Sequence, residues 1–336
     1  MAAAGVAAAL EYSGASDVAV FVVAGAALGG LAWVVSFATE ALGERTSAAV
    51  TGVLQSTLGN LPELFVVLFA LRAGEIVVAQ YSILGSLFAN ALLVLGLVVV
   101  AGARATPDGV MRFRRRLPND TATLLLLAVF IISLLGLSTS AGDRASRHVV
   151  GISAIGAVVL LLVYGAWLWS YLRAPGEELA ASRPRVALSA AIGLLAVSGA
   201  GAALVSEWFV GALDGAIETL GISRPFTGLV IVAIAGNAVE NVVGITLATK
   251  GKSDLAISVV KNSVAQIAVF LFPALVLLSL LFAERMTFVV PGVYIGALVL
   301  TAVAVWQITG DGEAAEFEGW ALCGLYAVLA VLTFYE

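Results

Sequence analysis

Long apolar segments separated by short polar breaks fill most of the chain. A helix needs about 20 consecutive, mostly apolar residues to cross the hydrocarbon core of a bilayer. The pattern predicts ten transmembrane helices, at residues 17–38, 47–71, 76–101, 121–140, 148–172, 186–206, 225–249, 254–281, 286–308 and 318–335. The Ala-rich first ten residues have no basic stretch, so we expect an interfacial segment there and not a cleaved signal.

A polar stretch at residues 173–185 divides these helices into two groups of five. An odd number of spans in each group makes the two groups enter the membrane in opposite senses, which is the pattern of inverted-topology repeats. We therefore predict an all-α polytopic membrane protein. Its parts are a first five-helix repeat at 1–172, a cytoplasmic linker at 173–185 and a second five-helix repeat at 186–336.

Composition agrees with this class. The 336 residues are 61% hydrophobic and 12% charged, whereas soluble proteins carry about 25% charged residues. The net charge of −5 is spread over a few short loops, and no charged tail points to a nucleic-acid partner. The single cysteine, Cys323, lies in an apolar stretch and can form no internal disulfide.

The Lys and Arg side chains predict the orientation. The loops after helices 1, 3, 5, 7 and 9 hold eleven of them, and the opposite loops hold five. The positive-inside rule places the richer set in the cytoplasm and both termini outside.

One five-residue frame occurs once in each half, as Gly59-Asn60-Leu61-Pro62-Glu63 and Gly236-Asn237-Ala238-Val239-Glu240. Positions three apart share a helix face, so each frame presents an amide beside a carboxyl group. A carboxylate at membrane depth marks an ion or proton path. Gly59 and Pro62 should loosen the second helix and expose carbonyl groups. The seventh helix has no matching proline, so only Gly236 points to a distortion there.

Other polar residues repeat between the halves. Ser86 and Asn90 are four apart in the third helix, as are Asn262 and Gln266 in the eighth. Glu40 closes the first helix, and Glu207 closes the sixth. A hard cation such as Ca²⁺ binds six to eight oxygens. The candidate ligands for the cation and the proton are Glu63, Glu240, Asn60, Asn237, Ser86, Asn90, Ser263 and Gln266.

Two neighbouring carboxylates without a cation resist double ionisation, so at least one should bind a proton. Competition of proton and cation for the same groups is the minimal physics of an antiporter. The alternative for the two glutamates is a structural ion pair with Lys or Arg. For the amides it is hydrogen bonding between helices. Glu40 and Glu207 fit an interfacial position as well as a gating or proton-path role. His148, in a loop, is read as incidental.

Lys261 falls inside the eighth helix, where the repeat places Gly85 in the third. An ammonium group at this depth is costly. It serves either as a tethered counter-ion of the site or as the partner of a carboxylate on a neighbouring helix.

These motifs resemble those of the cation/Ca²⁺ exchanger superfamily, and within it the calcium/proton exchangers. The similar segments are Ala38-Thr39-Glu40, Gly59 to Leu64, Gly85-Ser86-Leu87-Phe88-Ala89-Asn90, Val205-Ser206-Glu207, Gly228 to Val232 and Gly236 to Glu240, together with Gln80, Gln266 and Pro273. The resemblance implies two inverted five-helix halves. It also implies that Glu63 and Glu240 bind Ca²⁺ and H⁺ alternately, and that rocking of the first and sixth helices switches access.

The chain departs from the family's pattern at three places: Lys261-Asn262 precedes Ser263, Asn241 follows Glu240, and the linker has only two acidic residues. We predict a Ca²⁺/H⁺ antiporter of the cytoplasmic membrane, with Gln80 in its gate or proton path and no cofactor. The alternative is a Na⁺/H⁺ or K⁺/H⁺ antiporter in which Lys261 replaces part of the divalent charge. A membrane enzyme would need a catalytic set that the sequence lacks, and a passive channel would not need inverted repeats.

Overall fold

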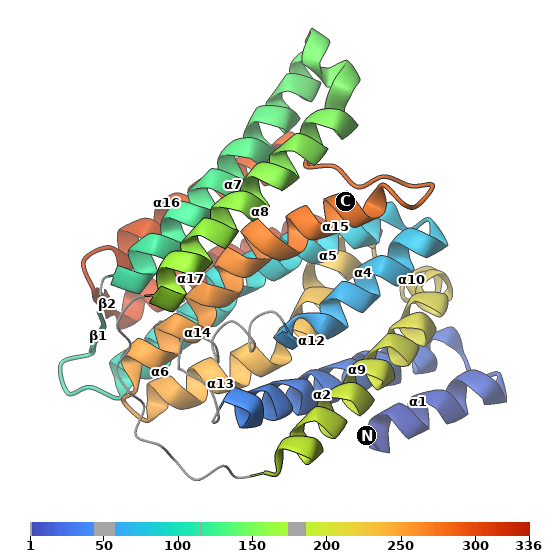
Figure 1. Cartoon of the computed structure of the whole chain (residues 1–336), viewed down its shortest axis with the longest axis horizontal. Coiled ribbons are helices and arrows are strands. Elements are labelled where there is room, and N and C mark those ends of the chain that lie inside the picture. The colour runs from blue at the N-terminus through green and yellow to red at the C-terminus, as the bar shows by residue number, and fades with distance from the viewer. Residues whose placement is uncertain (1, 44–57, 115, 174–185) are drawn as a thin grey trace.

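The computed structural model describes residues 2–43, 58–114, 116–173 and 186–336, and these are almost entirely helical (Figure 1). Eight helices of the described part are long and apolar enough to cross a membrane. The elements of the first half are α1 (Ala2–Ser13), α2 (Asp17–Gly43), α4 (Leu61–Ala73), α5 (Ile76–Phe88), the π-helical η1 (Ala89–Val94), α6 (Leu95–Arg104), β1 (Val110–Arg112), α7 (Arg116–Ala141), the 3₁₀ turn η2 (Arg144–His148) and α8 (Val149–Arg173).

The second half begins with α9 (Leu188–Gly211) after the predicted linker, most of which lies outside the described residues. Its further elements are α10 (Leu213–Leu220), α11 (Arg224–Phe226), the π-helical η3 (Thr227–Val232), α12 (Ala233–Gly236), α13 (Ala238–Thr249), α14 (Ser253–Gln266), the π-helical η4 (Ile267–Leu271), α15 (Phe272–Ser279), α16 (Gly292–Thr309), β2 (Glu313–Ala315) and α17 (Glu316–Phe334).

The helices follow the predicted spans closely, with three differences. Part of the predicted span 47–71 lies outside the described residues. The short helix α10 meets α11 at a bend of 117°, next to Gly221 in the left-handed conformation. The predicted span 286–308 begins later, at Gly292, because residues 286–291 are extended and end at Pro291, the N-cap of α16.

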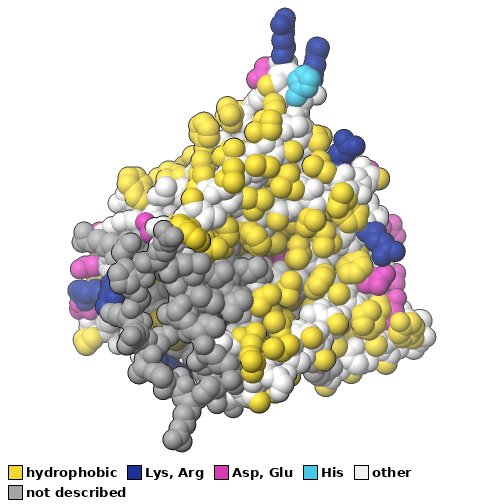
Figure 2. All heavy atoms as spheres, viewed as in Figure 1, with side chains coloured by type: hydrophobic (Ala, Val, Ile, Leu, Met, Phe, Trp, Pro, Cys, Tyr) yellow, Lys and Arg dark blue, Asp and Glu magenta, His cyan; other side chains and the backbone are white. Residues whose placement is uncertain are grey.

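Contacts between loops agree with the predicted sidedness. β1, after the third predicted span, pairs antiparallel with β2, after the ninth. The Arg114 backbone N–H donates to Asp254, which follows the seventh span. On the other side, Arg224 binds Glu75 and Asp214. In Figure 2 the charged side chains gather at the left and right edges and at the upper tip, with a broad apolar surface between them. Loops expected on one side of the membrane therefore do lie together.

The third and eighth predicted spans, α5–η1–α6 and α14–η4–α15, are the most buried of the described candidate spans. Each changes from α- to π-helix near its middle. A π turn inserts one extra residue and turns the following side chains, which is why such turns are frequent at functional sites. The helices α2 and α9 pack along each other beside this core (Figure 1).

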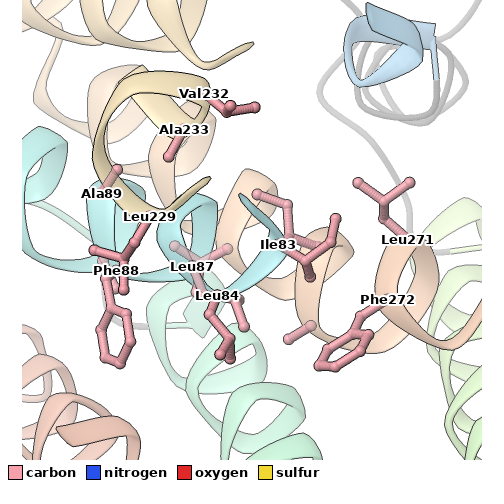
Figure 3. Packing of buried hydrophobic residues seen from close by; sticks show 14 of the residues in the cluster. Ile83, Leu84, Leu87, Phe88, Ala89, Leu229, Val232, Ala233, Leu271 and Phe272 are labelled. Carbon is pink, nitrogen blue, oxygen red and sulfur yellow. The ribbon is translucent and has the colours of Figure 1, made fainter. Parts of the chain in front are cut away.

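The first part of the seventh span crosses α5 at very short distance. An added Cβ at Gly85 would lie 2.5 Å from Leu229 Cα, and one at Gly228 would lie 2.9 Å from the Val78 carbonyl oxygen. Figure 3 shows Leu229 among the buried side chains of α5. Only glycine permits this approach of the two backbones, which joins the two halves of the chain at their centre.

We expect Gly85→Ala to separate α5 from η3 and to lower the stability of the folded protein by about 1–3 kcal/mol, the usual cost of overpacking. Thermal unfolding of the detergent-solubilised protein measures this change. Gly193→Ala on α9 is the matched control, because an added Cβ there meets no atom within 4 Å. Equal unfolding temperatures for the two variants would contradict the close crossing.

Candidate cation-binding site

Both signature segments interrupt a helix at the same residue. Asn60 and Asn237 form turns, with φ/ψ of −86°/9° and −99°/17°, and a new helix starts directly after each of them. Only the first segment contains a proline, and the seventh span, where only Gly236 pointed to a distortion, is interrupted as well. A proline is therefore not needed for the break. The shared Gly-Asn pair marks the break, and Pro62 occupies the first turn of α4, where a missing N–H costs little.

The breaks place each glutamate at the third position of a new helix, Glu63 in α4 and Glu240 in α13. The unpaired N–H groups of a helix N-terminus carry partial positive charge, which favours a carboxylate at this position. The carbonyl groups that end the preceding helix carry the opposite partial charge and suit a cation. One break therefore offers both a carboxylate and backbone oxygens.

Glu63 is only 3% exposed and lies in the protein interior. It borders a cavity of about 10 Å³ that Leu28 of α2, Phe209 of α9 and Gly236 of the second signature also line. An added Cβ at Gly236 would lie 3.8 Å from Glu63 Cβ, so the two signatures meet here. A cavity of this size holds about one water molecule. Leu28 and Phe209 are apolar residues without a sequence signal, and the sequence analysis missed them.

A hydrogen-bonded cluster joins the second signature to the first half of the chain. The Asn237 side-chain N–H₂ donates to Ser86 Oγ at 2.9 Å and to the Ala233 carbonyl at 2.7 Å. Asn90 Nδ2 donates to Asn237 Oδ1 at 2.6 Å and to the Ser86 carbonyl at 3.1 Å. Ser86, Asn90 and Asn237 are all buried. The structure thus brings together three of the predicted ligands, from α5, η1 and the break of the seventh span.

Several buried side-chain oxygens of α9, η1, α13 and α14 have no hydrogen-bond partner in the described part of the chain. They are Asn90 Oδ1, Ser206 Oγ, Asn241 Oδ1, Asn262 Oδ1, Ser263 Oγ and Gln266 Oε1. Buried polar atoms are nearly always satisfied, so such a group of orphaned oxygens needs an explanation. Amide and hydroxyl oxygens are ligands of hard cations. The chemistry of these oxygens is that of cation ligands, and their role as ligands stays a prediction.

The two halves correspond at one constant spacing along the chain. Asn60 is equivalent to Asn237 and the left-handed Gly74 to Gly251. The same spacing relates the first residues of α5 and α14, and it pairs Ser86 with Ser263 and Leu84 with Lys261. The predicted match of Lys261 with Gly85 is therefore wrong by one position. Motif matching missed this because the neighbouring residues are unlike in the two halves.

The remaining predicted residues lie apart from this cluster or outside the description. Gln80 Nε2 donates to the carbonyls of Thr287 and Val289, so it fixes the extended segment before α16. Its proton-path role stays a prediction. Glu207 is exposed on α9. The side chains of Glu40 and Glu240 lie outside the described part, although their backbones belong to α2 and α13.

The sequence and the fold of this chain match those of known proteins. The sequence profile of the sodium/calcium exchanger protein family matches residues 16–172 and 190–335. The chain belongs to this family. The exchanger is 31% identical over 349 residues to the Ca²⁺/H⁺ antiporter of Synechocystis, covering 98% of this chain and 94% of that protein. It is 33% identical over 319 residues to the vacuolar calcium ion transporter of Schizosaccharomyces pombe. That match covers 91% of this chain and 76% of the transporter.

Solved structures agree with the fold of this exchanger. The structure of native YfkE superimposes with a TM-score of 0.84 at 28% identity, covering 100% of this chain and 98% of that one. The H⁺/Ca²⁺ exchanger CAX superimposes with a TM-score of 0.72 at 16% identity. The superposition covers 95% of this chain and 86% of that one. The predicted all-α fold with two inverted repeats and the predicted family are confirmed.

We expect Asn237→Ala to lower stability by about 1–3 kcal/mol, because it leaves buried groups of Ser86 and Asn90 without their partner. Asn90→Ala should lower stability by a similar amount. The double variant should lose clearly less stability than the sum of the losses of the two single variants. Thermal unfolding measures all three. Asn119→Ala, at an exposed position, is the control. Additive losses for Asn90 and Asn237 would contradict the direct bond.

Proposed function

We propose that this exchanger moves Ca²⁺ in one direction across the membrane in return for protons moving in the other. The observation that carries the proposal is the pair of broken helices, each with a glutamate at the start of its second part. Buried amide and hydroxyl groups of both repeats meet at the second break, where Asn237 contacts Ser86 and Asn90. The names of the relatives, several of them Ca²⁺/H⁺ antiporters, support the choice of ions.

Competition at the carboxylates couples the two ions. One Ca²⁺ neutralises the charge of Glu63 and Glu240 together and takes oxygens from Asn60, Asn237, Ser86, Asn90, Ser263 and Gln266. When Ca²⁺ leaves, two negative charges in a medium of low dielectric constant repel each other strongly. Protons then bind in its place. The empty, doubly charged site is the state of highest energy, so each ion is released mainly in exchange for the other.

Access to the site changes, in this proposal, by movement of α2 and α9. Leu28 and Phe209 of these helices cover the cavity beside Glu63, and the two helices pack along each other as a pair. A shift of this pair relative to α4 and α13 would open the cavity first to one side and then to the other. The inverted repeats make the two openings structurally alike. Glu40, Glu207 and Gln80 are placed in the gate or proton path of this movement.

Transport in this proposal is ion exchange without covalent chemistry, so the protein is not an enzyme and holds no cofactor besides the transported ions. The repeats are 1–172 and 186–336, joined by the linker 173–185. The excess of Lys and Arg supports a cytoplasmic position for the linker and for the β1–β2 ribbon, with both termini outside. A cytoplasmic membrane is the proposed location.

Proteoliposomes loaded with a pH-sensitive dye test the exchange, with Ca²⁺, Mn²⁺, Na⁺ and K⁺ gradients imposed in turn. We expect a Ca²⁺ gradient to drive proton movement, and Glu63→Gln or Glu240→Gln to lower the rate at least 100-fold because neither amide can exchange a proton. Glu218→Gln, at an exposed position of α10, should keep the full rate. Ca²⁺ flux without proton movement would show a channel and would refute the proposal. A response to Na⁺ or K⁺ alone would favour the monovalent alternative.

Thiol labelling tests the orientation, because Cys323 is the only native cysteine. In a Cys323→Ser background, Ala145→Cys at the tip of the α7–α8 hairpin should react in intact cells with a reagent that does not cross membranes. Ala105→Cys, at the other side after α6, should react only after the membrane is opened. The reverse pattern would invert the proposed topology.

A further inference from the structure

Lys261 is a buried lysine, and no described carboxylate forms an ion pair with it. It is 1% exposed on α14, and its Nζ atom has no hydrogen-bond partner in the part of the chain that the structure describes. Glu63 and Lys261 are the only charged side chains found buried among the described residues. An isolated charge in an apolar interior is strongly unfavourable, so this position needs a reason other than packing.

The fold itself does not require a lysine here. Its equivalent in the first repeat is Leu84, which is fully buried in the apolar cluster on α5 (Figure 3). Two repeats of the same architecture thus hold a leucine in one half and, in the other, a lysine whose Nζ has no partner among the described residues. Replacing a buried charge by an apolar residue of similar size is commonly neutral or stabilising. Lys261 therefore fits a functional role and not a structural one.

The position of Lys261 relates it to the cation site. Asn262 and Ser263 follow it directly and Gln266 lies about one helical turn further along, and each of these three residues has an oxygen without a hydrogen bond. With a rise of about 1.5 Å per residue, the backbone of Lys261 lies within about 8 Å of all three. Salt screens buried charges much less than exposed ones, so a charge on Lys261 acts on an ion that these residues bind even where the ammonium group does not touch it.

The charges then add up differently from those of a site with two carboxylates alone. Glu63 and Glu240 supply two negative charges, and Lys261 offsets one of them. A bound monovalent ion neutralises this set, whereas a bound Ca²⁺ leaves one positive charge in excess. The repulsion between the ammonium group and the ion is proportional to the charge of the ion, so it acts twice as strongly on Ca²⁺ as on Na⁺.

We propose that Lys261 is a resident positive charge of the cation site, and that it lowers the preference of this exchanger for divalent over monovalent cations. The proposal rests on the proposed exchange of cations for protons at Glu63 and Glu240. It makes Lys261 a determinant of ion selectivity that acts by charge across a distance and not as a ligand.

The test uses the same dye-loaded proteoliposomes with four proteins: wild type, Lys261→Met, Lys261→Leu and Lys261→Arg. The half-saturating Ca²⁺ concentration and the Na⁺ concentration that half-inhibits Ca²⁺-driven proton movement are measured for each. The two neutral variants should lower the half-saturating Ca²⁺ concentration at least tenfold. They should lower the half-inhibiting Na⁺ concentration by only about threefold, since the repulsion scales with ionic charge. Lys261→Arg keeps the positive charge and should keep the wild-type ratio of the half-inhibiting Na⁺ concentration to the half-saturating Ca²⁺ concentration. Lys250→Met, which removes an exposed lysine, is the control.

An unchanged ratio in folded, active neutral variants would overturn the inference and leave the exchange itself intact. Loss of the fold in both neutral variants would overturn it too, because Lys261 would then be structural. If the wild type responds to monovalent ions alone, the proposed Ca²⁺ exchange fails. The inference on Lys261 then stands only if Lys261→Leu gains a Ca²⁺ response.

Discussion

The bond between the amide groups of Asn90 and Asn237 is the interaction on which the centre of this exchanger depends. A helix that is interrupted at membrane depth frees backbone N–H and C=O groups, and lipid cannot satisfy them. Asn237 forms the turn and uses its side chain to bind Ala233 of its own span and Ser86 of the other repeat. The break at Asn237 in the second half is therefore stabilised by the polar side chains of Ser86 and Asn90 in the first half.

Close backbone contact makes this bond possible. Gly85 and Gly228 allow α5 and η3 to approach so closely that no side chain fits between them. The π turn of η1 then begins beside Asn90, one residue before it. Apolar side chains surround this centre, and in the proposed function the polar atoms that lack a partner among the described residues are available to an ion. Rigid packing around the breaks thus coexists with an incompletely satisfied polar centre.

The two repeats are alike in backbone and unlike in charge. Both have the Gly-Asn break, the left-handed glycine before the next span and the π turn. Yet Ser86 is hydrogen-bonded to Asn237 while its counterpart Ser263 has an unpaired hydroxyl oxygen, and Leu84 corresponds to Lys261. In the proposed exchange, the symmetry of the backbone serves alternating access, and the asymmetry of the side chains sets the charge of the site.

The sequence by itself determined the membrane fold, the order of the spans and the two signature segments. Spans are set by local apolar length, and a buried Glu or Asn is conspicuous in an apolar helix. Only the tertiary structure decided the rest: the bond from Asn90 to Asn237, the cavity beside Glu63, the role of Gln80 in holding residues 286–291 extended, and the pairing of Lys261 with Leu84. Those features depend on contacts between residues far apart in the chain, and no local pattern encodes which side chains such contacts satisfy and which they leave unpaired.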